Sequence, residues 1–170
     1  GFFTDGALGD PFDDYVGCDV NRGLGYYYNG DNYDGENLGF KGYGYAPPAV
    51  GVDFFEGPYQ DDDGLDNAFG IGENEALNGI GYGDGIIDNE RFGMRRFLYY
   101  SNTTNGANPN QTDPINASDY YNYLRGFWKD GSPFYYGGSG HISDPDANPA
   151  IPCEFMFPGD TDPLGWGTGG

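Results

Sequence analysis

The sequence predicts a mixed, loop-rich fold that is mainly β, with one clear helix at about residues 118–130, an aromatic core and acidic ion-binding loops. Its 170 residues include 32 Gly and 12 Pro, which favour tight turns because glycine tolerates positive φ and proline fixes φ. They also include 16 Tyr, 13 Phe and 2 Trp, whereas disordered chains are poor in aromatic residues. We therefore expect residues 1–170 to form a single ordered domain.

The N-terminal third is turn-rich and contains two strand-like runs. These runs are residues 24–28 and 49–55, and Pro47 and Pro48 set an extended entry to the second. Residues 56–90 then form an acidic, Gly-rich stretch with almost no hydrophobic period, which is too long for a plain connection within a compact domain. We expect this stretch to be either disordered or organised by ions.

The C-terminal half contains the predicted helix. Residues 95–101 are typical of a strand with aromatic bulk, and a polar loop follows. Ser118 is a suitable N-cap and Asp119 suits the first helical turn, while Asp130 and Gly131 end the pattern. One face carries the apolar residues Tyr120, Tyr121, Leu124, Phe127 and Trp128, of which Tyr121, Leu124 and Trp128 are expected to be buried.

The charge is the most demanding feature of the composition. The 27 carboxylates face 7 basic residues, which gives a net charge of −20. Self-repulsion of this size opposes a compact state, and bound divalent cations would offset it. The same charge makes nucleic acid or an anionic membrane an unfavourable partner. No run of apolar residues is long enough to insert into a membrane.

The acidic loops are the principal candidate site. Residues 63–67 are echoed by residues 84–89 and, more loosely, by residues 31–35. Calcium takes oxygen ligands from carboxylates, amides and backbone carbonyls, and such loops supply them. The candidate calcium ligands are Asp31, Asp34, Asp61, Asp63, Asp66, Asn67, Asp84, Asp88 and Glu90. The spacing does not match an EF-hand, so solvated turns in which Asp and Asn bond the backbone are the alternative.

The cysteines and the asparagines suggest modifications. Cys18 and Cys153 lie near opposite ends of the chain and would form one disulfide in an oxidising compartment; two buried free thiols are the alternative. Three Asn-x-Ser/Thr triplets, at Asn102, Asn110 and Asn116, are candidate glycosylation acceptors.

Signals for catalysis are weak. His141 is the only histidine, and neither a Gly-x-Ser-x-Gly elbow nor a His-Glu-x-x-His motif is present. A hydrolase based on two carboxylates stays open, because nothing singles out a pair among so many. The tyrosine runs 26–28, 99–100 and 135–136 would stack on sugars, unless alternate rings fill the core and their neighbours cover the surface.

Five stretches resemble a region of large secreted proteins that are exported by the type IX secretion system of Bacteroidetes-type bacteria. They are DYVGCD at 14–19, GYAPPAVGVDFFEGP at 44–58, GDGIIDNERFGM at 83–94, DYYNYLRGFWKDG at 119–131 and FMFPGDTDPLGWGTGG at 155–170. The resemblance implies an extracellular or cell-surface location and a fragment of a longer secreted protein, but no defined activity. It also weakens the glycosylation prediction, since those bacteria need not use that acceptor rule.

The sequence therefore predicts a non-catalytic extracellular structural or interaction module, as in a fibre or filament, an adhesin or a matrix, stabilised by calcium. Its expected partners are further copies of itself or other surface proteins, joined by strand addition at a sheet edge. A glycan-binding module is the first alternative, and a carboxylate-based hydrolase fragment is the second.

Overall fold

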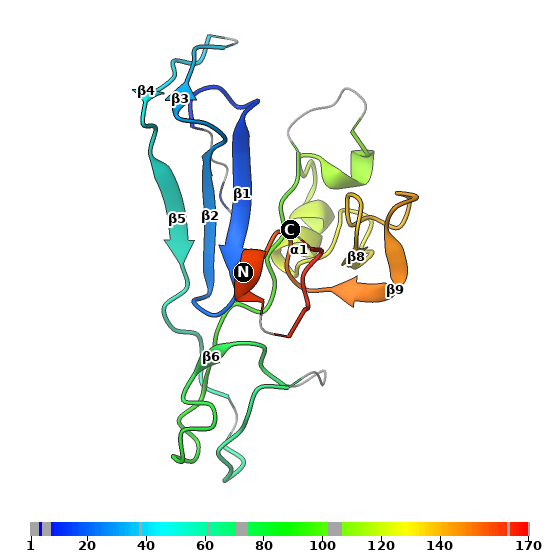
Figure 1. Ribbon diagram of the computed structural model, residues 1–170. Coiled ribbons are helices and arrows are strands. Elements are labelled where there is room, and N and C mark those ends of the chain that lie inside the picture. Colours follow the sequence, from blue (N-terminus) through cyan, green and yellow to red (C-terminus); the bar gives the residue numbers. More distant parts are fainter. Residues whose placement is uncertain are drawn as a thin grey trace.

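A computed structural model describes residues 4, 8–37, 39–60, 62–70, 75–101, 107–162 and 164–169. Its largest sheet is antiparallel, with strands β1 (Asp14–Asp19), β2 (Leu24–Asn29) and β5 (Ala49–Asp53) in the order β1-β2-β5 (Figure 1). The two strand-like runs at 24–28 and 49–55 are thus confirmed, the second ending at Asp53. The loop-rich, mainly β class with one helix is confirmed as well.

The described part of the chain also contains three small antiparallel sheets, two 3-10 turns and the helix discussed below. The paired strands are β3 (Tyr33–Asp34) with β4 (Gly44–Tyr45), β6 (Gly79–Ile80) with β7 (Arg91–Phe92), and β8 (Phe134–Tyr136) with β9 (Asn148–Cys153). The 3-10 turns are η1 (Pro109–Gln111) and η2 (Gly159–Thr161). No helix among the described residues is long and apolar enough to cross a membrane.

The large sheet packs one face on the core and leaves the other open. Cys18 and Gly25 are paired across β1 and β2 on the inner face, where a side chain at Gly25 would lie 2.6 Å from the Phe97 ring. Because side chains alternate along a strand, Tyr26 and Tyr28 lie on the opposite face. Glycine at position 25 therefore lets Phe97 approach the sheet closely.

The core is aromatic, as predicted, and consists of two clusters. One contains Tyr123, Trp128, Phe134, Cys153 and Met156; the other contains Cys18, Val20, Leu77 and Phe155. Phe97 packs against both clusters and so joins them. Large rings bury much area from few positions, which suits a chain with so few regular elements.

The helix α1 (Ala117–Leu124) is shorter than predicted. Asn116, not Ser118, is its N-cap, because the Asn116 side chain accepts bonds from the backbone N–H groups of Ser118 and Asp119. The helix stops because Gly126 takes the left-handed conformation, with φ of +72°.

The predicted buried face of the helix is largely wrong. Tyr121 is 61% exposed and Leu124 is 44% exposed, whereas Trp128 is buried but lies beyond the helix end. Tyr123 is the aromatic residue of α1 that enters the core. Ending the helix early turns the following residues, and with them Trp128, onto a different course.

The strand predicted at 95–101 is also wrong. Phe97 forms an isolated bridge with Phe155, and Ser101 forms another with Thr112. Each partner belongs to a different segment, so no continuous ladder develops. The stretch nevertheless runs through the middle of the molecule, which is why Phe97 can contact both clusters.

The predicted disulfide is not formed. Cys18 and Cys153 are buried free thiols in different core clusters. The Cys18 thiol donates to Met156 O at 3.4 Å, and the Cys153 thiol donates to Gly167 O at 3.1 Å. Burial, reinforced by nearby carboxylates, raises the pKa of Cys18 to about 12 and that of Cys153 to about 11. The structure therefore shows the alternative arrangement, two buried free thiols.

Candidate functional site

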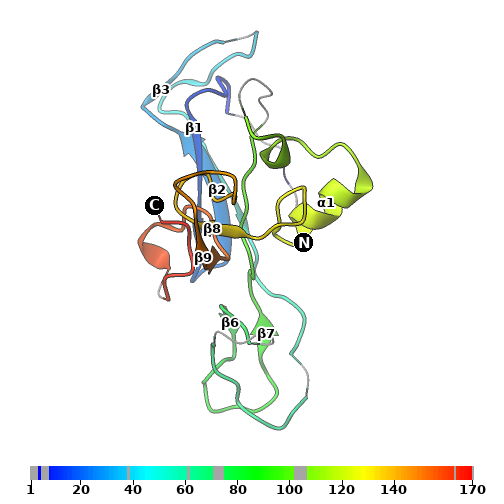
Figure 2. The same cartoon turned by 90° about the vertical axis from the view of Figure 1, so that its right-hand side faces the viewer.

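The acidic stretch forms a lobe at the end of the large sheet opposite β3 and β4, and two of its loops lie together (Figures 1 and 2). We call residues 62–67 and 83–90 the paired acidic loops. Asp66 of the first loop accepts hydrogen bonds from Gly83 N at 2.8 Å and Gly85 N at 2.7 Å. Asp88 of the second loop accepts from Asp63 N at 3.0 Å and Gly64 N at 2.9 Å. Each loop is therefore anchored by an aspartate of the other.

The first aspartate of each loop shapes its own turn. Asp63 accepts from Leu65 N at 2.9 Å and from the Asn67 side chain at 3.1 Å. Asp84 accepts from Ile86 N at 2.8 Å and from the Asn89 side chain at 3.0 Å. The similarity in sequence between residues 63–67 and 84–89 is thus also a similarity in structure, because the same residue types make the same hydrogen bonds.

Glu90 closes the base of the paired acidic loops. It is buried, and its carboxylate accepts from Asn67 N, while its backbone O accepts from Gln60 N at 3.0 Å. The structure therefore brings most of the predicted ligands of this region together. Asp61 lies outside the described residues.

The paired acidic loops form a cluster of hydrogen-bond acceptors that has no basic partner among the described residues. None of the ion pairs among the described residues includes a carboxylate of these loops. The same described part of the chain contains no group of three or more His, Cys, Asp or Glu side chains arranged to hold a metal ion. Calcium binding at the loops stays a prediction, in which backbone and amide oxygens would have to share the coordination.

Asp31 and Asp34 lie elsewhere: Asp31 precedes β3, and Asp34 is the last residue of β3. Asp31 Oδ1 accepts from Tyr33 N at 2.7 Å. Asp34 is buried, and its two oxygens accept from Asp10 N at 2.9 Å and Tyr43 N at 2.7 Å. These two carboxylates do not join the paired acidic loops; they shape the turns at the other end of the large sheet.

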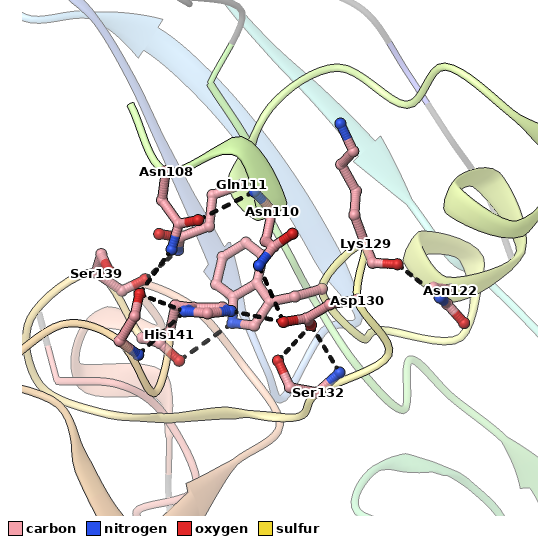
Figure 3. A network of polar contacts seen from close by, with 12 residues as sticks. Asn108, Asn110, Gln111, Asn122, Lys129, Asp130, Ser132, Ser139 and His141 are labelled. Atoms are coloured by element: carbon pink, nitrogen blue, oxygen red, sulfur yellow. Dashed lines mark hydrogen bonds and ion pairs between the residues drawn. The ribbon is translucent and has the colours of Figure 1, made fainter. Parts of the chain in front are cut away.

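A polar network around the only histidine was missed by the sequence reasoning (Figure 3). His141 is buried, and its Nε2 lies 3.0 Å from Asp130 Oδ2. Its Nδ1 accepts from Ser143 N at 3.1 Å, so the ring proton is on Nε2 and is donated to Asp130. The Ser143 hydroxyl lies 2.8 Å from the same Nδ1. No local signal could have found the central contact, because Asp130 and His141 are 11 residues apart and Asn110 lies 20 residues before Asp130.

Asp130 is the hub of the network. Besides His141, it accepts from Ser132 N at 2.9 Å, Ser132 Oγ at 2.6 Å and the Asn110 side chain at 3.0 Å. Burial raises the pKa of Asp130, but the hydrogen bonds from Ser132 and His141 outweigh it and hold the pKa below its ordinary value. The carboxylate is therefore kept ionised and ties three segments of chain together.

The order Asp130, His141, Ser143 is that of a hydrolytic triad, but the serine is poorly placed for attack. The Nδ1 lone pair already receives the Ser143 backbone N–H, and the Ser143 oxygen receives the Asn108 amide at 2.9 Å. Serine and histidine also lie two residues apart in one turn. The bonds account for a rigid turn, in which Trp128 Nε1 additionally donates to Gly140 O at 3.1 Å.

The outer face of the large sheet carries an aromatic surface made of Tyr15, Tyr26 and Tyr28. The Tyr15 and Tyr28 rings are stacked with centroids 6.1 Å apart, and Tyr26 lies 6.1 Å from Tyr28. Tyr15 and Tyr28 are exposed. Side chains built at Gly17 and Gly30 would overlap the Tyr26 and Tyr15 rings, so glycine lets these rings lie close on the backbone. One reading of the sequence was that side-chain alternation along β2 places neighbouring tyrosines on opposite faces of the sheet. In agreement with this alternation, Tyr26 and Tyr28, two residues apart, share the outer face.

A shallow pocket of about 50 Å³ lies between the paired acidic loops' lobe and the large sheet, lined in part by Phe54, Glu56 and Arg91. Its single carboxylate, Glu56, is ion-paired with Arg91 at 3.0 Å. A second carboxylate at the spacing of a glycosidase is not among the lining residues.

The candidate glycosylation acceptors fall in different settings. Asn110 bonds Asp130, and Asn116 caps α1, so both side chains have structural partners. Asn102 lies outside the described residues.

Comparisons with known proteins add no relative. No protein-family model matches the chain, and the searches of curated proteins and of solved structures likewise found no match.

Proposed function

We propose that this chain is a non-catalytic extracellular or cell-surface module of a fibre, adhesin or matrix, which associates with further copies of itself through strand β5 and is stabilised by calcium. The observation that carries the proposal is the open edge of the large sheet. β5 is the last strand in the order β1-β2-β5, and four of its residues, Ala49, Val50, Gly51 and Asp53, are exposed. The other edge differs, because Cys18 N on β1 donates to Phe157 O at 3.1 Å.

The outward groups of β5 follow from its register. Phe54 N donates to Gly23 O at 3.1 Å, which continues the ladder between β2 and β5. Hydrogen-bonded positions alternate along an antiparallel pair, so Ala49, Gly51 and Asp53 direct their N–H and C=O groups away from β2. Protected edges carry lysine, bulges or covering segments, and β5 has no lysine.

A second copy fits this edge. Antiparallel pairing about a two-fold axis through Gly51 sets Ala49 opposite Asp53 and Val50 opposite Val52. No like charges then face each other across the strands, and glycine meets glycine at the centre. The obstacle is the net charge of −20 on each copy, and calcium bound at the paired acidic loops would lower it.

Sedimentation velocity over a range of protein concentrations tests association, in EDTA and in about 1 mM calcium, the range of extracellular calcium modules. We expect a concentration-dependent dimer that calcium strengthens. Ala49→Pro removes one outward N–H without touching the β2 ladder and should weaken the dimer roughly tenfold or more. Ala49→Ser, which keeps the N–H, is the matched control. A monomer under all conditions would refute association through β5.

Calcium stabilisation has its own test. The melting temperature should fall sharply in excess EDTA and recover when calcium is restored. Unchanged melting, together with no bound metal by elemental analysis, would remove calcium from the proposal.

Glycan binding is the second candidate, favoured by the Tyr15, Tyr26 and Tyr28 surface. Closely spaced, exposed rings that lie near the backbone suit stacking on sugar faces. Affinity electrophoresis in gels containing polysaccharides would detect binding as retardation. Tyr15→Ala with Tyr28→Ala should abolish the retardation, whereas Tyr121→Ala, an exposed tyrosine on α1, should not.

A further inference from the structure

Three of the seven basic residues of this acidic chain lie together at the C-terminal end of α1. Arg95 and Arg96 both reach Glu154, with N–O distances of 3.9 Å and 2.6 Å. The guanidinium groups of Arg96 and Arg125 both lie over the Phe127 ring, 4.4 Å and 4.8 Å from its centroid. We call Arg95, Arg96, Arg125 and Phe127 the arginine patch.

The arginine patch has more positive charge than its carboxylate neutralises. Arg125 is exposed and enters no ion pair among the described residues. Burial lowers the pKa of Arg96 although Glu154 raises it, and repulsion from the other two arginines lowers it further. Three guanidinium groups thus share one carboxylate, so the patch keeps an excess of two positive charges.

The paired acidic loops have the opposite imbalance. Each of the two loops has three carboxylates and no basic residue, and none of these carboxylates enters an ion pair among the described residues. Asp62, Asp63 and Asp84 are exposed. The reciprocal hydrogen bonds of Asp66 and Asp88 already fix the loop backbones, so little further ordering is needed on binding.

Both surfaces also expose apolar side chains beside their charges. Leu65, Ile86 and Ile87 are exposed on the paired acidic loops. Tyr121 and Leu124 are exposed on α1 next to the arginine patch, and the Arg125 guanidinium lies 5.2 Å from the Tyr121 ring centroid. Apolar groups that become buried, with charged groups around them, are the ordinary composition of a protein–protein interface.

We propose that the arginine patch binds the paired acidic loops of a second copy of this chain. The two surfaces lie in different parts of the molecule, since α1 packs beside the large sheet and the lobe with the loops lies beyond the end of the sheet (Figures 1 and 2). Such a contact is heterologous, and repetition of a heterologous contact builds rings or filaments. It requires neither β5 nor calcium, so it stands or fails separately from the proposed function.

The net charge of −20 opposes any contact between two copies, and salt sets how far this repulsion reaches. The screening length is about 30 Å at 0.01 M salt, about 8 Å at 0.15 M and about 3 Å at 1 M. Distant charges therefore repel at low salt, whereas touching charges lose their attraction at high salt. We expect the contact to be strongest near 0.15 M salt, while pairing through β5, which has no ion pair, should only strengthen as salt is added.

Sedimentation velocity of the Ala49→Pro protein isolates this contact, because the substitution weakens pairing through β5. EDTA in the buffer keeps the loop carboxylates free of metal. In this background Arg125→Glu should weaken association at least about tenfold, since it sets a carboxylate against the acidic loops. Lys41→Glu makes the same change of charge at an exposed position between β3 and β4, and it should leave association unchanged.

An exchange of charges tests which surfaces meet. Asp62→Arg should also weaken association at least about tenfold, because the new guanidinium faces the arginine patch. In an equal mixture, the intact loops of the Arg125→Glu protein meet the intact patch of the Asp62→Arg protein. Association should therefore return in the mixture, which also shows that both variants are folded.

Three results would overturn the contact. They are equal association of the Ala49→Pro protein with and without Arg125→Glu, monomers at every concentration in the Ala49→Pro background, and no recovery in the mixture. None of these results bears on pairing through β5, which is measured in the unchanged protein. Retardation in gels that contain an anionic polysaccharide, lost in Arg125→Glu while no self-association is seen, would assign the arginine patch to a glycan and remove the second copy as its partner.

Discussion

Asp66 and Asp88 hold equivalent places in the paired acidic loops, and each accepts two backbone N–H groups from the loop of the other. The pairing contributes to the order of a stretch that has almost no hydrophobic period. Backbone donors that would otherwise face water are fixed by charged acceptors, which form stronger hydrogen bonds than neutral ones. Order in this lobe therefore comes from these polar contacts together with apolar packing, such as the stacked rings of Phe69 and Tyr82.

This reciprocity predicts local loosening when one partner is lost. Asp66→Ala leaves the N–H of Gly85 without the acceptor that lies 2.7 Å away, so that amide should exchange with deuterium roughly tenfold faster or more. The effect should stay within the lobe, and exchange in β1 and β2 should not change. Hydrogen exchange read by NMR measures both. Asp62→Ala, at an exposed position in the same loop, is the control. Unchanged protection of Gly85 would contradict the reciprocal anchoring.

The histidine network predicts a structural rather than a catalytic phenotype. His141→Ala deletes a buried ring and leaves Asp130 with one donor fewer, so we expect a loss of at least about 2 kcal/mol in the free energy of unfolding. Ser143→Ala removes only an exposed hydroxyl and should cost about 1 kcal/mol or less. Urea denaturation of both variants checks that His141→Ala loses more stability than Ser143→Ala. A hydrolytic activity that disappears in folded Ser143→Ala would instead contradict the non-catalytic proposal.

The two thiols should be present and inert in the native protein. With the pKa of Cys18 raised to about 12 and that of Cys153 to about 11, little thiolate exists at pH 8, and both groups are buried. Alkylation by iodoacetamide should therefore be slow until denaturant is added, after which two labels should be found by mass spectrometry. A native mass that is about two hydrogens lighter, with no labelling after unfolding, would show that the cysteines are bonded in solution.

The chain after α1 offers a matched pair of glycines. Gly126 and Gly131 have φ of +72° and +82°, so alanine at either position incurs backbone strain. At Gly126 the new Cβ would also overlap the side chain of Arg96, whereas at Gly131 its nearest neighbour would be 3.7 Å away. Both variants should be destabilised by about 1 kcal/mol, and Gly126→Ala by more. Equal losses in thermal unfolding would show that Arg96 moves aside freely.

Several elements were accessible to sequence reasoning because they depend on local chemistry. β2 and β5 follow from runs of aromatic and β-branched residues with Gly and Pro at their borders. The repeated Asp-Gly and Asp-Asn groups indicated two similar acidic turns, and those turns are present. The start of α1 was predicted within one residue, at about 118 rather than Ala117, although the N-cap is Asn116 and not the predicted Ser118.

Other features escaped because they depend on contacts between distant residues. The buried face of α1 was mispredicted, since the helical period was extended past Gly126 to Trp128. The hydrogen bond between Asp130 and His141 joins two turns, and nothing in the sequence near either residue indicates it. The disulfide was expected because an extracellular location is oxidising, but the fold assigns Cys18 and Cys153 to separate clusters.

The sequence by itself determined the chemistry that this protein has available: acidic turns, an aromatic core, two strong strands and one capped helix. Only the tertiary structure decided which groups meet, because pairing β1 with β2 sets Asp14 against Asn29 and leaves β5 open at its far edge. The physical reason is that turn and strand preferences act over a few neighbouring residues. Burial and register are set by the whole chain at once.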